Sequence, residues 1–247
     1  MWTTAAAPPL CYHAVTMGGA SKGGDRRPPR PAAETREILR RLIRQHPGAF
    51  TELAFASPFQ LLVATMLSAQ STDRRVNEVT PALFARYPDA AALGRAVPET
   101  LEPLIKPTGF FRAKSRTLSA MSRQLIERHG GEVPQDIEAL VQLPGVGRKT
   151  ANVVLGHAFG VPGLPVDRHV LRVANRLGIA RSDSPEIVER QLMAATPRRQ
   201  WTLLSDTLIL HGRRVCRPRP LCERCAVVHL CEYALAAGVL APASRRP

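Results

Sequence analysis

The stretch from Leu143 to Asp167, LPGVGRKTANVVLGHAFGVPGLPVD, constrains the fold of this chain more than any other. It opens with a tight turn in which Gly145 and Gly147 occupy positions that require a positive φ or a close approach to a ligand. Residues 148–159 follow with apolar side chains at helical spacing, which predicts a helix. Unpaired N–H groups and the positive end of the helix dipole point out of such a turn. The stretch therefore predicts an anion-binding site.

The overall charge indicates which kind of anion this site meets. The 247 residues carry a formal net charge of +14 and a pI near 10.8, which indicates a polyanionic partner. Aromatic residues make up only 5% of the chain, too few for a platform that stacks many exposed bases. No apolar run approaches the roughly 20 residues of a membrane-spanning helix, and no signal peptide is recognised. We expect a cytoplasmic protein that binds nucleic-acid phosphates and no membrane.

Two residues of the same stretch have the chemistry of a catalytic pair. Lys149 lies in the first turn of the predicted helix, where the dipole disfavours a cation and favours the neutral, nucleophilic amine. Burial is expected to act in the same direction. Asp167 follows the helix and is a candidate partner carboxylate. The alternative roles are a phosphate-binding lysine and an aspartate that caps the next helix, and Asp167 can both cap and catalyse.

Four of the five cysteines lie close together, in the pattern Cys216-x5-Cys222-x2-Cys225-x5-Cys231. In a chain without an export signal, this pattern indicates metal binding rather than disulfides. Four thiolates can hold one tetrahedral Zn²⁺ or a [4Fe–4S] cluster. Zinc sites commonly use two short pairs, and only Cys222 and Cys225 form one. Cys11 is interpreted as an incidental thiol.

The rest of the chain has helical periodicity, and no stretch alternates as a strand does, so we expect an all-α fold. Residues 59–70 are apolar nearly all round and should form a buried helix. Asp73 is expected to cap the following helix, and Pro81 to kink or split it. Residues 1–32 and 236–247 are expected to be disordered tails, the first of them basic.

Residues 34–235 resemble the endonuclease III family of DNA glycosylases. The resemblance is carried by LPGVGRKTANVV, by the LSAQSTD segment that ends at Asp73, and by the four cysteines. It implies two helical lobes: a six-helix lobe at 52–162 with a helix-hairpin-helix motif, and a second lobe that joins 33–51 to 163–235. The second lobe would end in an iron–sulfur cluster loop. Lys149 and Asp167 would then face each other between the lobes.

The resemblance also implies an activity. A bifunctional glycosylase of this family everts an oxidised pyrimidine from double-stranded DNA. Lys149 would attack the sugar, Asp167 would assist, and a Schiff base would lead to β-elimination at the abasic site. Such an enzyme is expected to act as a monomer on damaged or abasic DNA, associated with the bacterial nucleoid.

The family pattern assigns further residues by position. Gln70 would fill the space left by the everted base, and Phe110 would wedge between bases. The remaining DNA contacts would be Gly145, Gly147, Arg148, Arg217 and Arg219, and the [4Fe–4S] ligands would be Cys216, Cys222, Cys225 and Cys231. Without the resemblance, Gln70 is interpreted as a surface residue at a helix end, and Phe111 as a core aromatic. The chain departs from the family in a first cysteine spacing one residue shorter and in Arg168, where a small hydroxyl residue is usual.

Two other functions are compatible with part of this pattern. A monofunctional, adenine-specific glycosylase shares the hairpin, the aspartate and the cluster, but it generally lacks this lysine and differs at the Gln70 segment. A non-catalytic helix-hairpin-helix module would need neither Lys149 nor Asp167. The presence of both residues favours the bifunctional enzyme.

Overall fold

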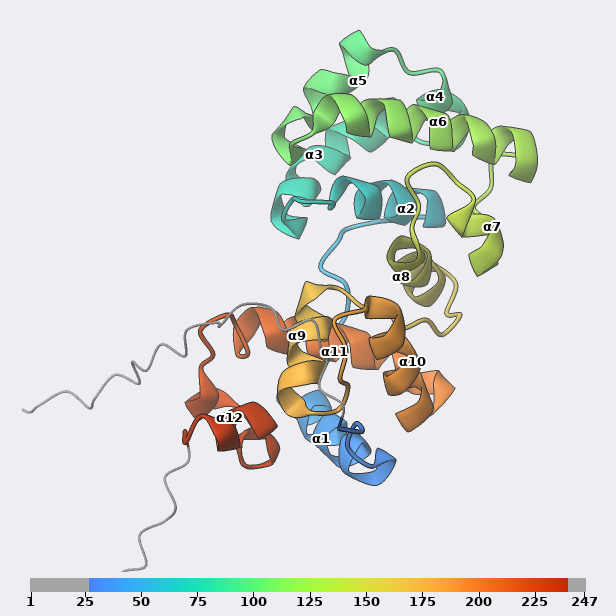
Figure 1. The fold of residues 1–247 in the computed structure, drawn as a ribbon. Coiled ribbons are helices and arrows are strands. Elements are labelled where there is room, and N and C mark those ends of the chain that lie inside the picture. The colour runs from blue at the N-terminus through green and yellow to red at the C-terminus, as the bar shows by residue number, and fades with distance from the viewer. Residues whose placement is uncertain (1–26, 240–247) are drawn as a thin grey trace, which may run out of the picture.

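The computed structural model describes residues 27–239, and within them every regular element is a helix (Figure 1). The all-α prediction is therefore confirmed. The α-helices are α1 (Ala32–Gln45), α2 (Pro58–Leu67), α3 (Asp73–Arg86), α4 (Ala90–Gly94), α5 (Pro98–Ile105), α6 (Phe111–His129), α7 (Ile137–Val141), α8 (Arg148–Ala158), α9 (Arg168–Leu177), α10 (Pro185–Ala195), α11 (Trp201–Arg214) and α12 (Glu232–Ala236). Short 3-10 turns are η1 (Lys106–Thr108), η2 (Arg198–Gln200), η3 (Cys222–Arg224) and η4 (Val228–Leu230). None of these helices is both long and apolar enough to cross a bilayer.

The buried side chains form two hydrophobic cores. The first core gathers apolar residues between positions 53 and 155, from α2 to α8. The second core combines α1 with residues 164–234, so that α1 packs beside α9, α10 and α11 (Figure 1). Residues 52–162 contain seven α-helices rather than the six expected, two of them only five residues long. The predicted lobe boundaries themselves remain a prediction.

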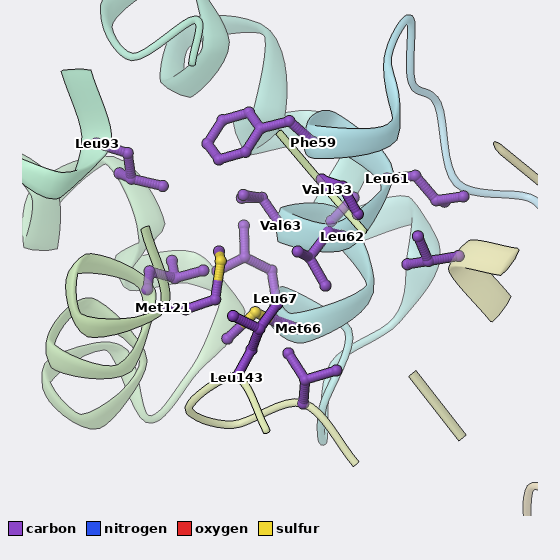
Figure 2. Packing of buried hydrophobic residues seen from close by; sticks show 14 of the residues in the cluster. Phe59, Leu61, Leu62, Val63, Met66, Leu67, Leu93, Met121, Val133 and Leu143 are labelled. Atoms are coloured by element: carbon purple, nitrogen blue, oxygen red, sulfur yellow. The ribbon is translucent and has the colours of Figure 1, made fainter. Parts of the chain in front are cut away.

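Helix α2 is the centre of the first core. Its side chains contact α4, α6 and the segments around Val133 and Leu143, as Figure 2 shows. Leu61, Leu62 and Val63 are fully buried, and each such side chain stabilises the fold by about 1.5–3 kcal/mol. The helix begins at a side-chain cap, where Ser57 Oγ accepts from Gln60 N at 3.2 Å. It ends at Leu67, so the expectation that it continues to residue 70 is wrong.

Helix α3 differs from its sequence prediction in two ways. Thr72, not Asp73, caps it, because Thr72 Oγ1 accepts from Arg75 N at 3.2 Å. Pro81 lies inside a continuous helix of 14 residues, so the expected split does not occur. Pro81 removes one backbone hydrogen bond, and the buried faces on either side of it offset that loss. The buried residues of α3 are Val76, Val79, Thr80 and Leu83.

The predicted tails need correction at their inner ends. Arg30 lies in the expected N-terminal tail, yet its Nε donates to Leu177 O at 2.9 Å and its Nη2 to Leu230 O at 2.8 Å. At the other end, Val239 N donates to Ala234 O at 3.1 Å. Packed residues therefore extend beyond the predicted limits at 32 and 236. Residues 1–26 and 240–247, with Cys11, lie outside the described residues.

Candidate active site

The glycine turn before α8 has the expected closure, with Val146 N donating to Leu143 O at 3.0 Å. Gly145 has a φ of +76°, and a Cβ there would lie 2.3 Å from Thr117 Cγ2. Both the backbone conformation and the packing therefore require glycine at this position. Gly147 has a φ of −90°, and a Cβ added there would meet open space, so of the two expected reasons for a glycine only the close approach to a ligand remains at this residue.

The N-terminus of α8 is open. Gly147 is its N-cap and supplies no side-chain acceptor, so no side chain caps the first amides of the helix. Lys149 lies in this first turn and is exposed, which corrects the expectation that it is buried. The turn therefore presents amide donors and an accessible amine on the same surface, an arrangement suited to an anionic ligand.

Lys149 and Asp167 line one cavity of about 60 Å³. Lys149 comes from α8, Asp167 from the segment between α8 and α9, and the opposite wall from α11 and the N-terminal end of α3. Residues 18 positions apart in sequence are thus brought to the same space, as the sequence predicted for a reacting amine and carboxylate. Phe50, His157 and Asp206 form another part of the wall.

The carboxylate of Asp167 is held in place by the helix that follows it. Its Oδ1 accepts from His169 N at 2.7 Å and from Val170 N at 2.9 Å, which makes Asp167 the N-cap of α9. Upstream, Ser205 Oγ donates to Pro165 O at 2.6 Å and anchors the segment. The capping role and a place in the cavity are therefore compatible, because the cap bonds use a single carboxylate oxygen.

The two residues after Asp167 differ in their surroundings. Arg168 is exposed, and the structure contains nothing that explains its presence in place of a small hydroxyl residue. His169 is half-buried, and its Nδ1 lies 3.1 Å from Arg172 Nη2. Burial lowers the pKa of His169, against the opposing charge of Asp167. His169 is thus a packed, hydrogen-bonded histidine.

A buried glutamate that the sequence did not reveal links α8 to α10. Glu189 is only 4% exposed and accepts from Arg148 Nε at 2.8 Å and from Arg148 Nη2 at 3.0 Å. Asn152 Nδ2 adds a third bond to the same carboxylate at 3.2 Å. The guanidinium predicted to meet DNA is therefore already paired with an acidic side chain of the second lobe.

Three further ion pairs line the cavity. His157 Nε2 lies 2.9 Å from Asp206 Oδ2, and the ring of Phe50 packs against His157 with centroids 4.9 Å apart. Arg213 of α11 pairs with Asp73 at 2.6 Å and with Glu52. Sequence reasoning missed all of these. The usable signal was Asp206, a charge within the apolar run 203–210, because a buried carboxylate requires a partner.

The pKa of His157 reflects its partner. Burial of the imidazole acts to lower its pKa, but the hydrogen bond and charge of Asp206 outweigh burial and raise it above the usual value. The carbonyl of Val153, 2.9 Å from His157 Nδ1, acts in the same direction. The surroundings of His157 therefore favour its protonated form more than bulk water does.

Gln70 and Phe110 lie at a second hollow, of about 240 Å³, which Gly145 also lines. They are the two non-glycine residues with positive φ between residues 27 and 239, at 53° and 49°. Phe110 is 66% exposed, whereas Phe111 packs partly against the first core, which agrees with its interpretation as a core aromatic. The structure thus brings the two predicted duplex-probing residues to one surface, beside the glycine turn.

The four clustered cysteines surround one cavity with apolar walls. No group of three or more Cys, His, Asp or Glu side chains in the described part of the chain is placed to hold a single metal ion. A zinc site needs such convergence on one point, whereas a [4Fe–4S] cluster is held by four thiolates placed around it. Burial raises the pKa of the Cys225 thiol to about 11, so binding any metal must displace protons. The donor set and the enclosing walls fit the cluster.

The basic loop between the first two cysteines is anchored from behind. Arg176 donates to Arg217 O at 2.6 Å and to Pro218 O at 3.0 Å, and its guanidinium lies over the ring of Tyr233. The Arg217 and Arg219 residues are both exposed. The loop therefore presents positive charge to solvent on a fixed backbone.

Comparison with known proteins places these features in a family. Residues 63–198 match the pattern of the HhH-GPD superfamily of base excision DNA repair proteins. The chain is 52% identical to endonuclease III of Synechocystis over 202 residues, covering 81% of this chain and 92% of that protein. It is 45% identical to endonuclease III of Escherichia coli strain K12, covering 81% and 96%. A solved structure of a trapped endonuclease III–DNA covalent intermediate superposes with a TM-score of 0.81 and 41% identity, covering 84% and 98%.

Proposed function

The chain belongs to the HhH-GPD superfamily of base excision DNA repair proteins and, within it, to the endonuclease III family, and from that premise we propose how its residues carry out repair. It is a DNA glycosylase with AP lyase activity. We assign oxidised pyrimidines in double-stranded DNA as its substrates and a monomer as its active form. One observation carries the assignment of the site: Lys149 and Asp167 line the same cavity beside the glycine turn.

Lys149 is the nucleophile of this proposal. Its Nζ forms a bond to the sugar C1′ while the bond from C1′ to the base breaks, and the base leaves with the electron pair. The attacking amine must be neutral, so Asp167 takes the proton that the amine loses. The chain has four lysines, and of the three between residues 27 and 239 Lys149 is the one that lines the cavity. Another, Lys114, donates to two backbone carbonyls and is committed elsewhere.

Asp167 has a second role in the proposal. Positive charge develops on the sugar as the base departs, and a fixed carboxylate stabilises it without reorganising. The two cap bonds to the α9 amides support this role, because they hold the carboxylate in one orientation. The C1′–O4′ bond then breaks, O4′ takes a proton, and C1′ forms a Schiff base with the lysine nitrogen. The Schiff base loses a proton from C2′, and the 3′ phosphate leaves in β-elimination.

DNA binding in this proposal begins at the phosphates. The uncapped amides of the glycine turn bind one phosphate, with Gly145, Gly147 and the main chain of Arg148 as contacts. Arg217 and Arg219 meet others from the cysteine loop. Gln70 and Phe110 enter the duplex, and their exposure next to each other supports that role.

Cys216, Cys222, Cys225 and Cys231 would hold a [4Fe–4S] cluster. When bound, the cluster would supply folding energy to the C-terminal segment that carries these cysteines. The backbone that displays Arg217 is tied to Arg176, so the cluster and this arginine together fix the basic loop. The apolar walls around the thiols exclude water from the site.

Borohydride trapping tests the proposal directly, because it reduces a lysine Schiff base to a stable covalent bond. Lys149→Gln should abolish trapping and strand cleavage on both thymine-glycol duplex and abasic duplex while DNA binding persists. Loss of a covalent nucleophile costs several powers of ten, on the order of 5–8 kcal/mol of barrier. Lys106→Gln, at an exposed lysine outside the cavity, is the matched control and should still trap. Trapping by Lys149→Gln would assign the nucleophile to another amine.

A further inference from the structure

Two exposed residues of the proposed DNA surface have a backbone conformation that needs support. Gln70 and Phe110 have φ of 53° and 49°, in the left-handed region that side chains other than glycine rarely adopt. Both lie in connecting segments, Gln70 after α2 and Phe110 directly before α6. Such conformations persist only where the surrounding structure holds them. Contacts from outside the two segments must therefore constrain them.

One side chain joins the two segments. Lys114 Nζ donates to Leu67 O at 2.8 Å and to Thr108 O at 2.8 Å. Leu67 is the last residue of α2 and precedes Gln70 by three positions, and Thr108 precedes Phe110 by two. A single ammonium group thus connects the end of one segment to the start of the other, and Lys114 itself lines the hollow between Gln70 and Phe110.

The chemistry of this position indicates a specific role for a lysine. Lys114 lies in the first turn of α6, where the helix dipole disfavours a cation. Its side chain is half-buried, and desolvation lowers its pKa. Both effects oppose a charged amine here. Two charge-assisted hydrogen bonds oppose this loss. One of them is accepted by the carbonyl at the C-terminal end of α2, where the dipole of α2 is negative.

We propose that Lys114 is a positioning residue that holds Gln70 and Phe110 at the separation needed to enter the duplex together. This inference depends on the proposed function, because it gives the two residues their role in DNA. Lys114 contacts neither DNA nor the reacting atoms in this proposal. It acts by linking the carbonyls of Leu67 and Thr108, so that Gln70 fills the vacated stack while Phe110 separates the bases.

The test compares one substrate that requires opening of a duplex with one that does not. Lys114→Met removes both hydrogen bonds, and Lys114→Arg keeps a cation and donors. Excision from thymine-glycol duplex in single-turnover conditions should fall by about tenfold in Lys114→Met and recover largely in Lys114→Arg. Trapping on a single-stranded abasic oligonucleotide should stay within about twofold of wild type, because no stack has to be opened. The fluorescence of 2-aminopurine beside the lesion should rise less when Lys114→Met binds the duplex than when the wild-type protein binds it.

A double-mutant comparison separates positioning from general stabilisation. In a Gln70→Ala/Phe110→Ala background, Lys114→Met should lower the rate of excision from the duplex by less than about twofold, because the two residues that Lys114 positions are absent. The proposal is overturned if Lys114→Met lowers duplex excision as much in that background as in the wild-type background. It is also overturned if Lys114→Met lowers trapping on the single-stranded substrate as much as excision on the duplex. If Lys114→Met does not fold, Lys114→Gln replaces it, because it keeps a donor for one carbonyl. The same comparison of duplex and single-stranded substrates then tests the proposal. A wild-type protein that fails to trap on abasic duplex instead refutes the proposed function.

Discussion

Arg148 and Glu189 form a two-bonded ion pair between α8 and α10, next to the proposed nucleophile Lys149. The pair connects a helix of the first core to a helix of the second. Glu189 is almost fully buried, and Arg148 is half exposed. The charge of Arg148 is therefore largely neutralised within the protein, although its place beside the glycine turn suggests a DNA contact.

The first prediction concerns the two kinds of arginine. Arg148→Met should leave the salt dependence of DNA binding unchanged, because its side chain already pairs with Glu189. Arg219→Ala should reduce the salt slope by about one unit if its side chain meets a phosphate. Arg148→Met should also destabilise the fold by about 2 kcal/mol, less than for a fully buried pair because Arg148 is half exposed. Fluorescence anisotropy with undamaged duplex at several salt concentrations, and urea unfolding, measure both effects. A reduced slope in Arg148→Met would mean that the ion pair opens on DNA.

The second prediction separates the two roles of Asp167. Asp167→Asn keeps an oxygen for the α9 amides and should retain stability, yet slow base release by about a hundredfold or more. It should keep measurable cleavage at a preformed abasic site, where no base is expelled. Asp167→Ala should lose about 1 kcal/mol of stability in addition, because the cap is removed. Near-wild-type base release by Asp167→Asn would leave Asp167 with the capping role alone.

The third prediction is a pH dependence of stability. Folding raises the pKa of His157 above its usual value of 6.5, so its contribution is fully present below the unfolded pKa. That contribution is lost as pH rises through the folded pKa. The difference in unfolding midpoint between wild type and His157→Gln should therefore shrink as pH rises from the acidic to the alkaline side of neutrality. Asp206→Asn should show the same trend. A difference independent of pH would show that His157 stabilises the fold only by packing.

The fourth prediction concerns the cysteines. Protein purified under anaerobic conditions should be brown and contain about four iron atoms and four sulfides per chain. Cys222→Ser should lower soluble yield and iron content together, because losing a ligand removes folding energy. Ser115→Ala, at a buried position of α6 far in sequence from the cysteines, is a control for general loss of packing. A colourless, fully active protein with stoichiometric zinc would contradict the cluster.

Local patterns accounted for much of the fold. Ser57 and Asp136 have side chains that favour helix N-caps, and both cap the helices that follow them. Gly145 has the positive φ that a tight turn demands. Errors arose where packing outweighed a local rule. Pro81 remains inside α3 because the helix is held on a buried face.

The sequence by itself determined the helices, the glycine turn, the candidate pair Lys149 and Asp167, and the spacing of the four cysteines. The helices and the glycine turn depend on neighbours within a few residues, which a single chain displays directly, and the pairing of Lys149 with Asp167 rested on the resemblance of the longer motif. Only the tertiary structure decided that Arg148 pairs with Glu189, and that Lys114 joins the segments of Gln70 and Phe110. Arg148 and Glu189 lie 41 positions apart and Lys114 and Leu67 lie 47 apart, and the burial that makes a charge need a partner exists only once the helices have packed.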